Sequence, residues 1–366
     1  MSKIFEVFGF PLESNHPDAI SHREQAKCPF SGIDCDGGGN RYLSALQLEA
    51  HPELAKRFPD RNRLQVGVCS LLIRDKPWIV CPRRLLVLGS SGQIELQKTV
   101  RGQLVKHGGL SLAQGCRVWS EVKVKTSTQS AGEKITFDYT FDYVVASSCR
   151  KSISEVAEMT GMSENVCERL AGENQFTLAR RDGRVWIDDF PGDPIAIVEI
   201  MTCSTSGGNK EKRTQIGMAF EDAILKGKDH EGPGINYRQV WARMASQLVA
   251  KSQIGLAWGG RTVWILQDVL ADYISKSTRL DLHQYLSETA DEVNVLVFGY
   301  EESLLPDQAS GVVLLENFQF FSGPISVGSE SPGRDGFVDI IKVGFVPPKE
   351  LLWRSLFRKP PCGAIQ

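Results

Sequence analysis

An apolar, strand-like run that contains a single carboxylate, IAIVEIM at residues 195–201, limits most strongly what this chain can fold into. Successive side chains of a strand point to opposite faces, so Glu199 lies on an otherwise apolar face and the other face is apolar as well. The first face carries Ile195, Ile197, Glu199 and Met201, and the second carries Ala196, Val198 and Ile200. An ionised carboxylate that is buried alone costs several kcal/mol. The sequence therefore predicts either a cation built in beside Glu199 or a metal ion bound to it.

The composition is that of an ordinary globular protein. Of its 366 residues, 42% are hydrophobic and 23% are charged. This length is sufficient for two domains or for one elaborated domain. The net charge of −2 argues against an overall basic field for nucleic acid, although a local cleft can be basic on a neutral protein. The N-terminus lacks the apolar segment of a signal peptide and no apolar run reaches about 18 residues, so we expect a cytoplasmic protein without a membrane span.

Strand-like and helical patterns alternate along the chain, which predicts an α/β protein. Helical patterns cover residues 41–58, 96–108, 214–227 and 236–255, and a strand that runs into a helix covers 262–274. Pro52 is a position at which the first helix can break or restart. Strand-like runs cover residues 64–73, 78–82, 116–126, 134–147, 294–300 and 336–345. The first two of these runs flank RDKP, which is typical of a tight turn. The basic tail, residues 351–366, is expected to be partly loose.

Residues 150–192 differ in character from their surroundings. A short helix, a turn at Thr160–Met162, a Ser163 N-cap and a second helix are followed by an Asp-Gly turn between alternating strands. Two helices and a hairpin in this order form the outline of a small winged helix. We therefore expect a helix-turn-helix insertion at residues 150–192.

Nine cysteines are a large and odd number for a cytoplasmic protein. Four of them lie in the first hundred residues, at Cys28, Cys35, Cys69 and Cys81. Four thiolates in a tetrahedron bind zinc or iron and can stabilise a small core. The spacing contains no CxxC pair, so buried free cysteines of the core are an equally good interpretation.

Three carboxylates, Glu121, Asp142 and Glu199, lie within strand-like segments, where acidic residues are disfavoured. Carboxylates that converge from neighbouring strands can hold Mg²⁺, which activates water against a phosphodiester. Glu121 and Asp142 have polar neighbours and also fit a solvated strand face, whereas Glu199 does not. The sequence has no HExxH, no P-loop and no GxGxxG after a strand, which leaves a metabolic metalloenzyme with little support.

The order and spacing of CPF, GVC, VCPRRLL, SEVKVKT, FDYVVA and VEIMT over about residues 25–300 resemble the NotI-type restriction endonucleases. The resemblance implies a PD-(D/E)XK nuclease core, a mixed central sheet flanked by helices, at residues 101–366. It implies an N-terminal region at 1–100 whose four cysteines (Cys28, Cys35, Cys69 and Cys81) hold iron or zinc. Glu121, Asp142 and Glu199 would be catalytic, with Mg²⁺ on Asp142 and Glu199. The family implies a bacterial, cytoplasmic type II enzyme that cuts specific double-stranded DNA sequences as a homodimer.

One departure concerns the catalytic strand. Two residues after the Glu, the family has Gln and many related nucleases have Lys, whereas this chain has Met201. A thioether carries no charge and donates no hydrogen bond. Three explanations remain open: a polar group such as Lys212 or Gln215 reaches in, the metal suffices, or the protein is inactive. The third would make it a sequence-specific DNA-binding protein or regulator that uses the helix-turn-helix.

A second departure is the insertion, because the family has a much shorter interval between Asp142 and Glu199. A recognition helix at about residues 163–171 would lie in the major groove, with Arg169 on guanine and Asn165 on adenine. Phosphate contacts would come from Arg180, Arg181 and Arg184. Residues 150–192 contain six basic and eight acidic side chains, so a dimer contact or a cover for the core is the alternative role.

Overall fold

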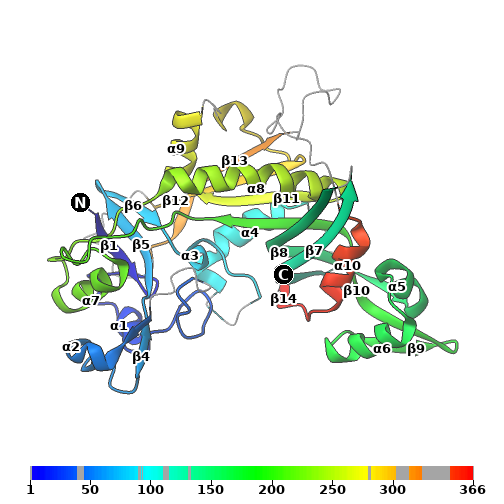
Figure 1. Cartoon of the computed structure of the whole chain (residues 1–366), viewed down its shortest axis with the longest axis horizontal. Coiled ribbons are helices and arrows are strands. Elements are labelled where there is room, and N and C mark those ends of the chain that lie inside the picture. The colour runs from blue at the N-terminus through cyan, green and yellow to red at the C-terminus, as the bar shows by residue number, and fades with distance from the viewer. Residues whose placement is uncertain are drawn as a thin grey trace.

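The computed structural model describes residues 2–38, 45–89, 92, 94–109, 115–130, 133–278, 282–301, 313–323 and 347–365. A mixed eight-stranded sheet forms its centre, as the α/β prediction requires (Figure 1). The strand order is β13 (Leu315–Gly323), β12 (Val293–Tyr300), β11 (Arg261–Gln267), β10 (Arg184–Met201), β8 (Glu133–Ser152), β7 (Cys116–Ser130) and β14 (Gly363–Ile365), with β9 (Leu178–Arg181) beside β10. Strands β10, β11 and β12 are parallel, and the other pairs are antiparallel.

Apolar side chains fill both faces of the central sheet. Val198 and Ile200 of β10 lie in the core beneath α4 (Lys98–His107), whereas Ile195 and Ile197 point to the opposite face. There they pack with the end of α8 (Tyr237–Ala257), the long helix that runs along the sheet in Figure 1. The predicted alternation of β10 is therefore confirmed, and both faces of its end are buried.

A second sheet, of order β2–β1–β5–β6, lies at the N-terminal end of the molecule. Its strands are β1 (Ser2–Val7), β2 (Phe10–Pro11), β5 (Val68–Ile73) and β6 (Lys76–Ile79), and the helices around it are α1 (Pro17–Gln25), α3 (Pro82–Leu85) and α7 (Ile216–Lys226). Phe8 meets Phe220 of α7 edge to face at 5.8 Å between ring centroids. One hydrophobic core contains both these residues and Trp264 of β11, so the two sheets are packed together.

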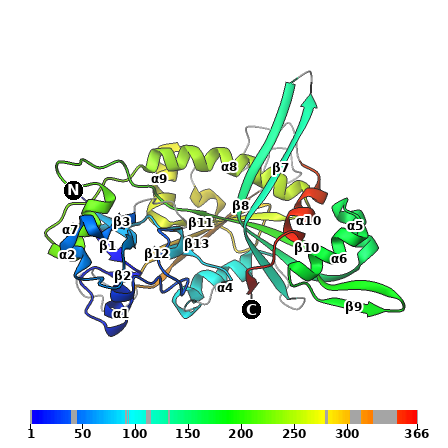
Figure 2. The same cartoon turned by 60° about the horizontal axis from the view of Figure 1, so that its bottom comes forward.

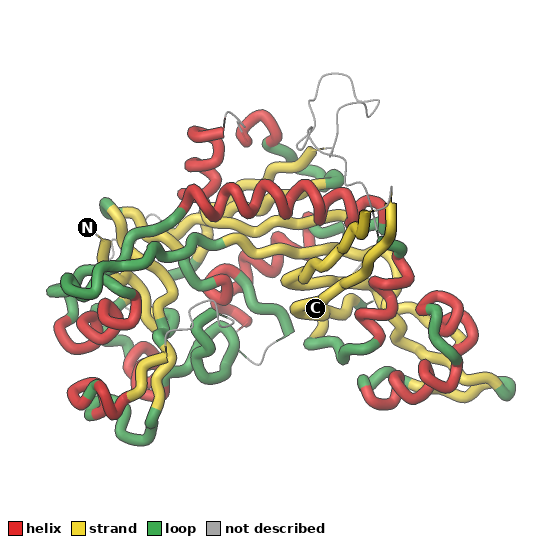
Figure 3. Tube along the Cα trace, in the orientation of Figure 1, coloured by secondary structure: helices red, strands yellow, loops and turns green. Residues whose placement is uncertain are grey.

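Two structures extend from the opposite end of the central sheet. The β7–β8 hairpin continues beyond the sheet as a ribbon, and the insertion carries α5 (Ile153–Thr160), α6 (Glu164–Glu173) and β9 (Figure 2). Ser152 and Glu155 form a reciprocal capping box that starts α5. The predicted helix, turn, helix and hairpin are confirmed. Figure 3 shows the insertion and the N-terminal sheet at opposite ends of the molecule.

Two local predictions are wrong. Instead of one helix over 41–58, the described part of that segment forms β3 (Ala45–Gln47), a 3₁₀ turn (Leu48–Ala50) and α2 (Pro52–Ala55), with β3 paired to β4 (Arg63–Gln65). Pro52 lacks the N–H that would continue an earlier helix, and it starts a new one. The tail is not loose, because α10 (Lys349–Phe357) buries its apolar side chains and β14 pairs with β7.

The remaining helix, α9 (Asp268–Thr278), follows β11 directly, as predicted. The strand expected at 336–345 lies outside the described residues. Among the helices that the structure describes, none combines the length and the apolar character needed to span a membrane.

Candidate functional site

The three predicted carboxylates lie in one row across three neighbouring strands. Ser120 pairs with Tyr143 and Val122 with Phe141, so Glu121 of β7 stands opposite Asp142 of β8. Tyr143 in turn pairs with Val198, which places Asp142 and Glu199 at the next position of the β8–β10 ladder. Since neighbouring strands are about 4.8 Å apart, the backbones of all three residues lie within about 10 Å of one another.

The row lies where β8 leaves β10. Asp142 Oδ2 accepts a hydrogen bond of 2.8 Å from the backbone N–H of Ile200, so the side chain replaces the strand partner that β10 loses there. Glu121 is exposed and has a φ of 48°, a left-handed conformation that costs free energy for a residue other than glycine. The local backbone thus turns Glu121 and Asp142 toward the same cavity.

Glu199 is 1% exposed, and a cation is built in beside it. Lys251 of α8 is 3% exposed, and its Nζ donates to Glu199 Oε2 at 2.5 Å and to the backbone oxygen of Thr140 at 2.8 Å. The ring of Phe141 lies 5.5 Å from the same Nζ. Of the two alternatives that the sequence left open, the structure contains the built-in cation.

The carboxyl group of Glu199 is nevertheless only half satisfied. Within the described part of the chain, its buried Oε1 has no hydrogen-bond partner. Burial, and after it the nearby carboxylate of Asp142, raise the pKa of Glu199 to about 8 against the opposing effect of Lys251. An acid with an unpartnered oxygen and a pKa in this range is prepared to exchange its proton for a cation.

The cavity beside this row has a volume of about 620 Å³. Glu121, Asp142 and Tyr143 line its sheet wall, whereas Glu199 does not line it. The opposite wall comes from the N-terminal region and includes Ser31, Ile33, Gly38, Pro82, Arg83 and Leu86. Arg83 donates from Nε and from its terminal nitrogen to both carboxylate oxygens of Asp36, so a positive side chain is held on the wall that faces the acids.

The four predicted cysteine ligands gather behind that N-terminal wall. Cys81 hydrogen-bonds to Cys69 and interacts electrostatically with Cys28 and Cys35. The hydrogen bond with Cys69 lowers the pKa of Cys81, and the backbone N–H groups of the two residues after Pro82 lower it further. Burial raises the pKa of Cys28 and Cys35.

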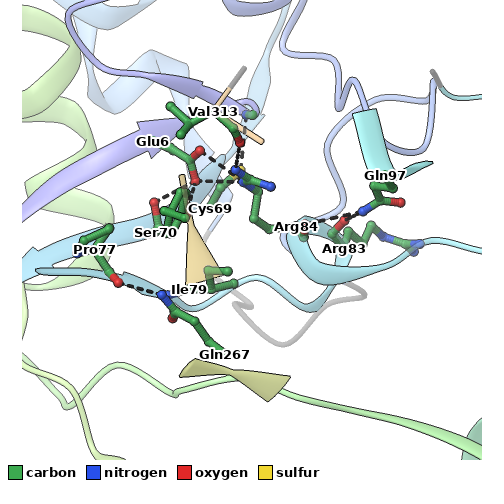
Figure 4. Close-up of polar contacts among 12 residues, drawn as sticks. Glu6, Cys69, Ser70, Pro77, Ile79, Arg83, Arg84, Gln97, Gln267 and Val313 are labelled. Carbon is green, nitrogen blue, oxygen red and sulfur yellow. Dashed lines mark hydrogen bonds and ion pairs between the residues drawn. The ribbon is translucent and has the colours of Figure 1, made fainter. Parts of the chain in front are cut away.

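A buried ion pair, Glu6–Arg84, lies beside Cys69 (Figure 4). Arg84 Nε donates to Glu6 at 3.0 Å, and both side chains are completely buried. Glu6 Oε2 also accepts hydrogen bonds of 2.7 Å from Ser70 and from Tyr300, which belong to different sheets. This pair therefore joins the cysteine region to the central sheet.

Within the described ranges, the structure contains no group of three or more His, Cys, Asp or Glu side chains arranged to hold a metal ion. The four cysteines and the three carboxylates are brought into two neighbourhoods, but both metal sites remain predictions. The backbone N–H donors around Cys81 and the 3.2 Å hydrogen bond from Gly9 N–H to Cys69 Sγ suit thiolate ligands.

Neither polar group predicted to replace the missing Gln or Lys contacts Glu199 in the described hydrogen bonds. Lys212 is exposed in the loop before α7, and Gln215 caps α7 and lines a separate cavity. Sequence reasoning missed Lys251, although a signal existed. The buried face of α8 contains Val240, Met244, Leu248, Lys251 and Gly255 at helical spacing, so Lys251 interrupts an apolar stripe.

The predicted DNA-binding residues of the insertion are largely paired with acids. Arg169 bonds Glu173 at 2.9 Å, Arg180 bonds Glu168 at 3.1 Å, and Arg181 bonds Asp188 at 3.3 Å. Asn165 and Arg184 are exposed. These surface pairs are weak enough for a polyanion to compete with them, so the DNA role of the insertion remains a prediction.

Comparison with known proteins leaves the family open. No family model, no curated protein and no solved structure matches this chain.

Proposed function

We propose that the protein is a Mg²⁺-dependent type II restriction endonuclease that cuts double-stranded DNA as a homodimer on a PD-(D/E)XK core. The observation that carries the proposal is the row of Glu121, Asp142 and Glu199 across β7, β8 and β10, beside a cavity and with a buried lysine behind it. A pure DNA-binding protein has little use for Glu121 and Asp142 on the wall of a cavity that phosphates would enter.

Asp142 and Glu199 would hold the metal, which when bound polarises a phosphodiester and lowers the pKa of a water ligand. The hydrogen bond from Ile200 N–H fixes the carboxylate of Asp142. Lys251 holds Oε2 of Glu199 and leaves the unpartnered Oε1 as the ligand atom. Because the buried carboxyl group has a raised pKa, metal binding at neutral pH would release its proton.

Lys251 supplies the charge that the strand itself lacks at Met201. Met201 is 3% exposed and belongs to the core between the two sheets, so it has no polar role. Lys251 comes from α8, which packs on the same sheet face as Ile195 and Ile197, and there it orients Glu199. We therefore assign it the role of a positioning residue.

Cys28, Cys35, Cys69 and Cys81 would hold one iron or zinc ion. Such a site joins three separate chain segments and stabilises them outright. Two of these segments continue into the cavity wall, through Gly38 after Cys35 and through Pro82 and Arg83 after Cys81. The proposed structural metal would thus hold the wall that faces the carboxylates.

Cleavage tests the catalytic part of the proposal. The purified chain with Mg²⁺ is expected to cut phage DNA of known sequence into discrete fragments. Asp142→Ala removes a proposed direct ligand of the metal and should lower the cutting rate by more than the roughly 10- to 100-fold loss that changes in outer-shell partners cause, while DNA binding persists. Asp272→Ala, on the exposed face of α9, is the control and should cut normally.

Two outcomes would contradict nuclease activity. Methylated and unmethylated DNA that both stay intact with Mg²⁺ or Mn²⁺ would exclude it. Binding without cutting by the unmodified chain would instead favour the catalytically inactive DNA-binding protein.

Metal analysis tests the cysteine site. The protein as purified should contain about one iron or zinc ion per chain, and Cys81→Ser should lower both the metal content and the melting temperature. Cys149→Ser is the matched control, because Cys149 lies on β8, outside the cluster. Equal metal content in the two variants would reject the four-cysteine ligand set.

A further inference from the structure

The β7–β8 ribbon is a feature that the proposed catalytic site does not explain. The part of β8 before Tyr143 does not pair with β10. It pairs only with β7, as far as Ser130 of β7 and Glu133 of β8. Figure 2 shows this ribbon standing well clear of the sheet. An isolated two-stranded ribbon has little stability of its own, so its length calls for a reason.

One face of the ribbon accounts for its attachment. Val122, Val124, Phe137 and Phe141 are buried in the core that contains Trp258 and the apolar residues of α10. Ser355 of α10 also donates a 3.1 Å hydrogen bond to the backbone oxygen of Lys123. The packing anchors the base of the ribbon and fixes which face points outward.

The outward face is polar and carries two lysines. Lys123 and Lys125 alternate with the buried valines on β7, and their side chains are 61% and 63% exposed. Opposite them on β8 lie the exposed residues Thr136, Asp138 and Thr140. Asp138 is shared between the lysines, at 3.4 Å from Lys123 Nζ and 3.1 Å from Lys125 Nζ.

This face continues the row of acids. On β7, Lys123 and Lys125 share a face, and Glu121, whose φ of 48° interrupts the regular strand, comes two residues before Lys123. On β8, Asp138 and Thr140 share a face, and Asp142 comes two residues after Thr140. Since Glu121 and Asp142 line the cavity, the lysine face begins at its edge and leads away from it.

We propose that the polar face of the ribbon binds the sugar–phosphate backbone of double-stranded DNA next to the scissile phosphodiester. This inference rests on the proposed function. Lys123 and Lys125 are about 6.7 Å apart along the strand, about twice the 3.4 Å rise per nucleotide of one DNA strand, so they can contact two phosphates. The threonine hydroxyls add donors that contact phosphate oxygens without reading sequence.

Asp138 keeps the two lysines together in the free protein. A phosphate backbone then competes with one carboxylate for two cations, because Lys123, Lys125 and Asp138 together carry a net charge of +1. Exposed ion pairs of this kind contribute little to stability, so the exchange has a small cost.

The salt dependence of binding tests the proposal. The parent is the full chain with Asp142→Ala, which should not cut, and the probe is a duplex with the mapped site, followed by fluorescence anisotropy between about 50 and 200 mM salt. Lys123→Ala/Lys125→Ala should weaken binding and make the slope of log K against log salt shallower by about 1.8. Asp138→Asn should tighten binding.

Lys56→Ala/Lys276→Ala is the matched control, because it removes the same charge from exposed, ion-paired lysines at the C-terminal end of α2 and on α9. An equal change of slope in both double variants would overturn the proposal, as would an unchanged slope in the ribbon variant. A changed oligomeric state with unchanged DNA affinity would overturn it too, by assigning the face to a second copy of the chain. Failure of the unmodified chain to cut DNA would reject the proposed nuclease activity, which is a separate outcome from the salt dependence of the ribbon variants.

Discussion

Two buried ion pairs, Glu6–Arg84 and Glu199–Lys251, differ in how completely their carboxylates are hydrogen-bonded, although Arg84 Nη1 has no hydrogen-bond partner among the described residues. Both carboxylate oxygens of Glu6 accept hydrogen bonds. Oε1 accepts one from Arg84, and Oε2 accepts three, from Ser70, Arg84 and Tyr300. Glu199 accepts one hydrogen bond from Lys251 on Oε2, and its buried Oε1 has no partner among the described residues.

The difference separates a structural contact from a prepared ligand. A buried carboxylate that is fully hydrogen-bonded joins the segments that supply its donors, and Glu6 joins β1, β5, α3 and β12. A buried carboxylate with an unused oxygen carries a cost that folding alone does not repay. That cost is expected where another ligand binds, and Glu199 lies next to the acids of the cavity.

The largest expected effect comes from removing the cation of each pair. Arg84→Met should lower the free energy of unfolding by about 3–5 kcal/mol, because it leaves Glu6 buried without its cation. Lys251→Met should cost about 1–2 kcal/mol, mainly the lost hydrogen bonds, because Glu199 can be neutralised by a proton. Urea unfolding at neutral pH measures both.

A double variant sharpens this contrast. Glu6→Leu/Arg84→Met should recover much of the stability that Arg84→Met loses, since no buried charge remains. Equal losses for Arg84→Met and Lys251→Met would mean that the two pairs have the same structural role.

The smaller expected effect is a pH dependence that belongs to Glu199. Its pKa is about 8 in the folded chain against an ordinary value of 4.5, so between these pH values the folded chain holds a proton that the unfolded chain has released. The contribution of this group to the free energy of unfolding should therefore be largest below about pH 4.5. It should fall as the pH rises toward 8 and level off above about pH 8. Melting temperatures across this range, compared with Glu199→Gln, measure the effect.

Divalent cations provide the control for this pH effect. Mg²⁺ or Ca²⁺ should restore stability at pH 8 in the unmodified chain and not in Glu199→Gln, because the ion replaces the lost proton. A parallel pH profile in the two proteins would show that Glu199 does not titrate in this range.

Much of the fold could be predicted from local patterns. The alternation of β10, the helices α4 and α8, and the two helices and hairpin of the insertion follow from periodicity, capping residues and an Asp-Gly turn. The predictions failed where a local signal was overruled by packing. The basic residues of the tail predict a partly loose segment, yet Leu352 and Phe357 are completely buried, and this burial orders α10.

The candidate site divides in the same way. The sequence by itself determined that Glu199 lies on an apolar strand face and needs a partner, because side-chain direction in a strand depends on its neighbours in the chain. Tertiary structure alone decided that the partner is Lys251, on a helix packed against that face, and that Glu121 and Asp142 stand in the same row. Strand register and helix packing set these contacts, and both depend on residues far apart in the chain.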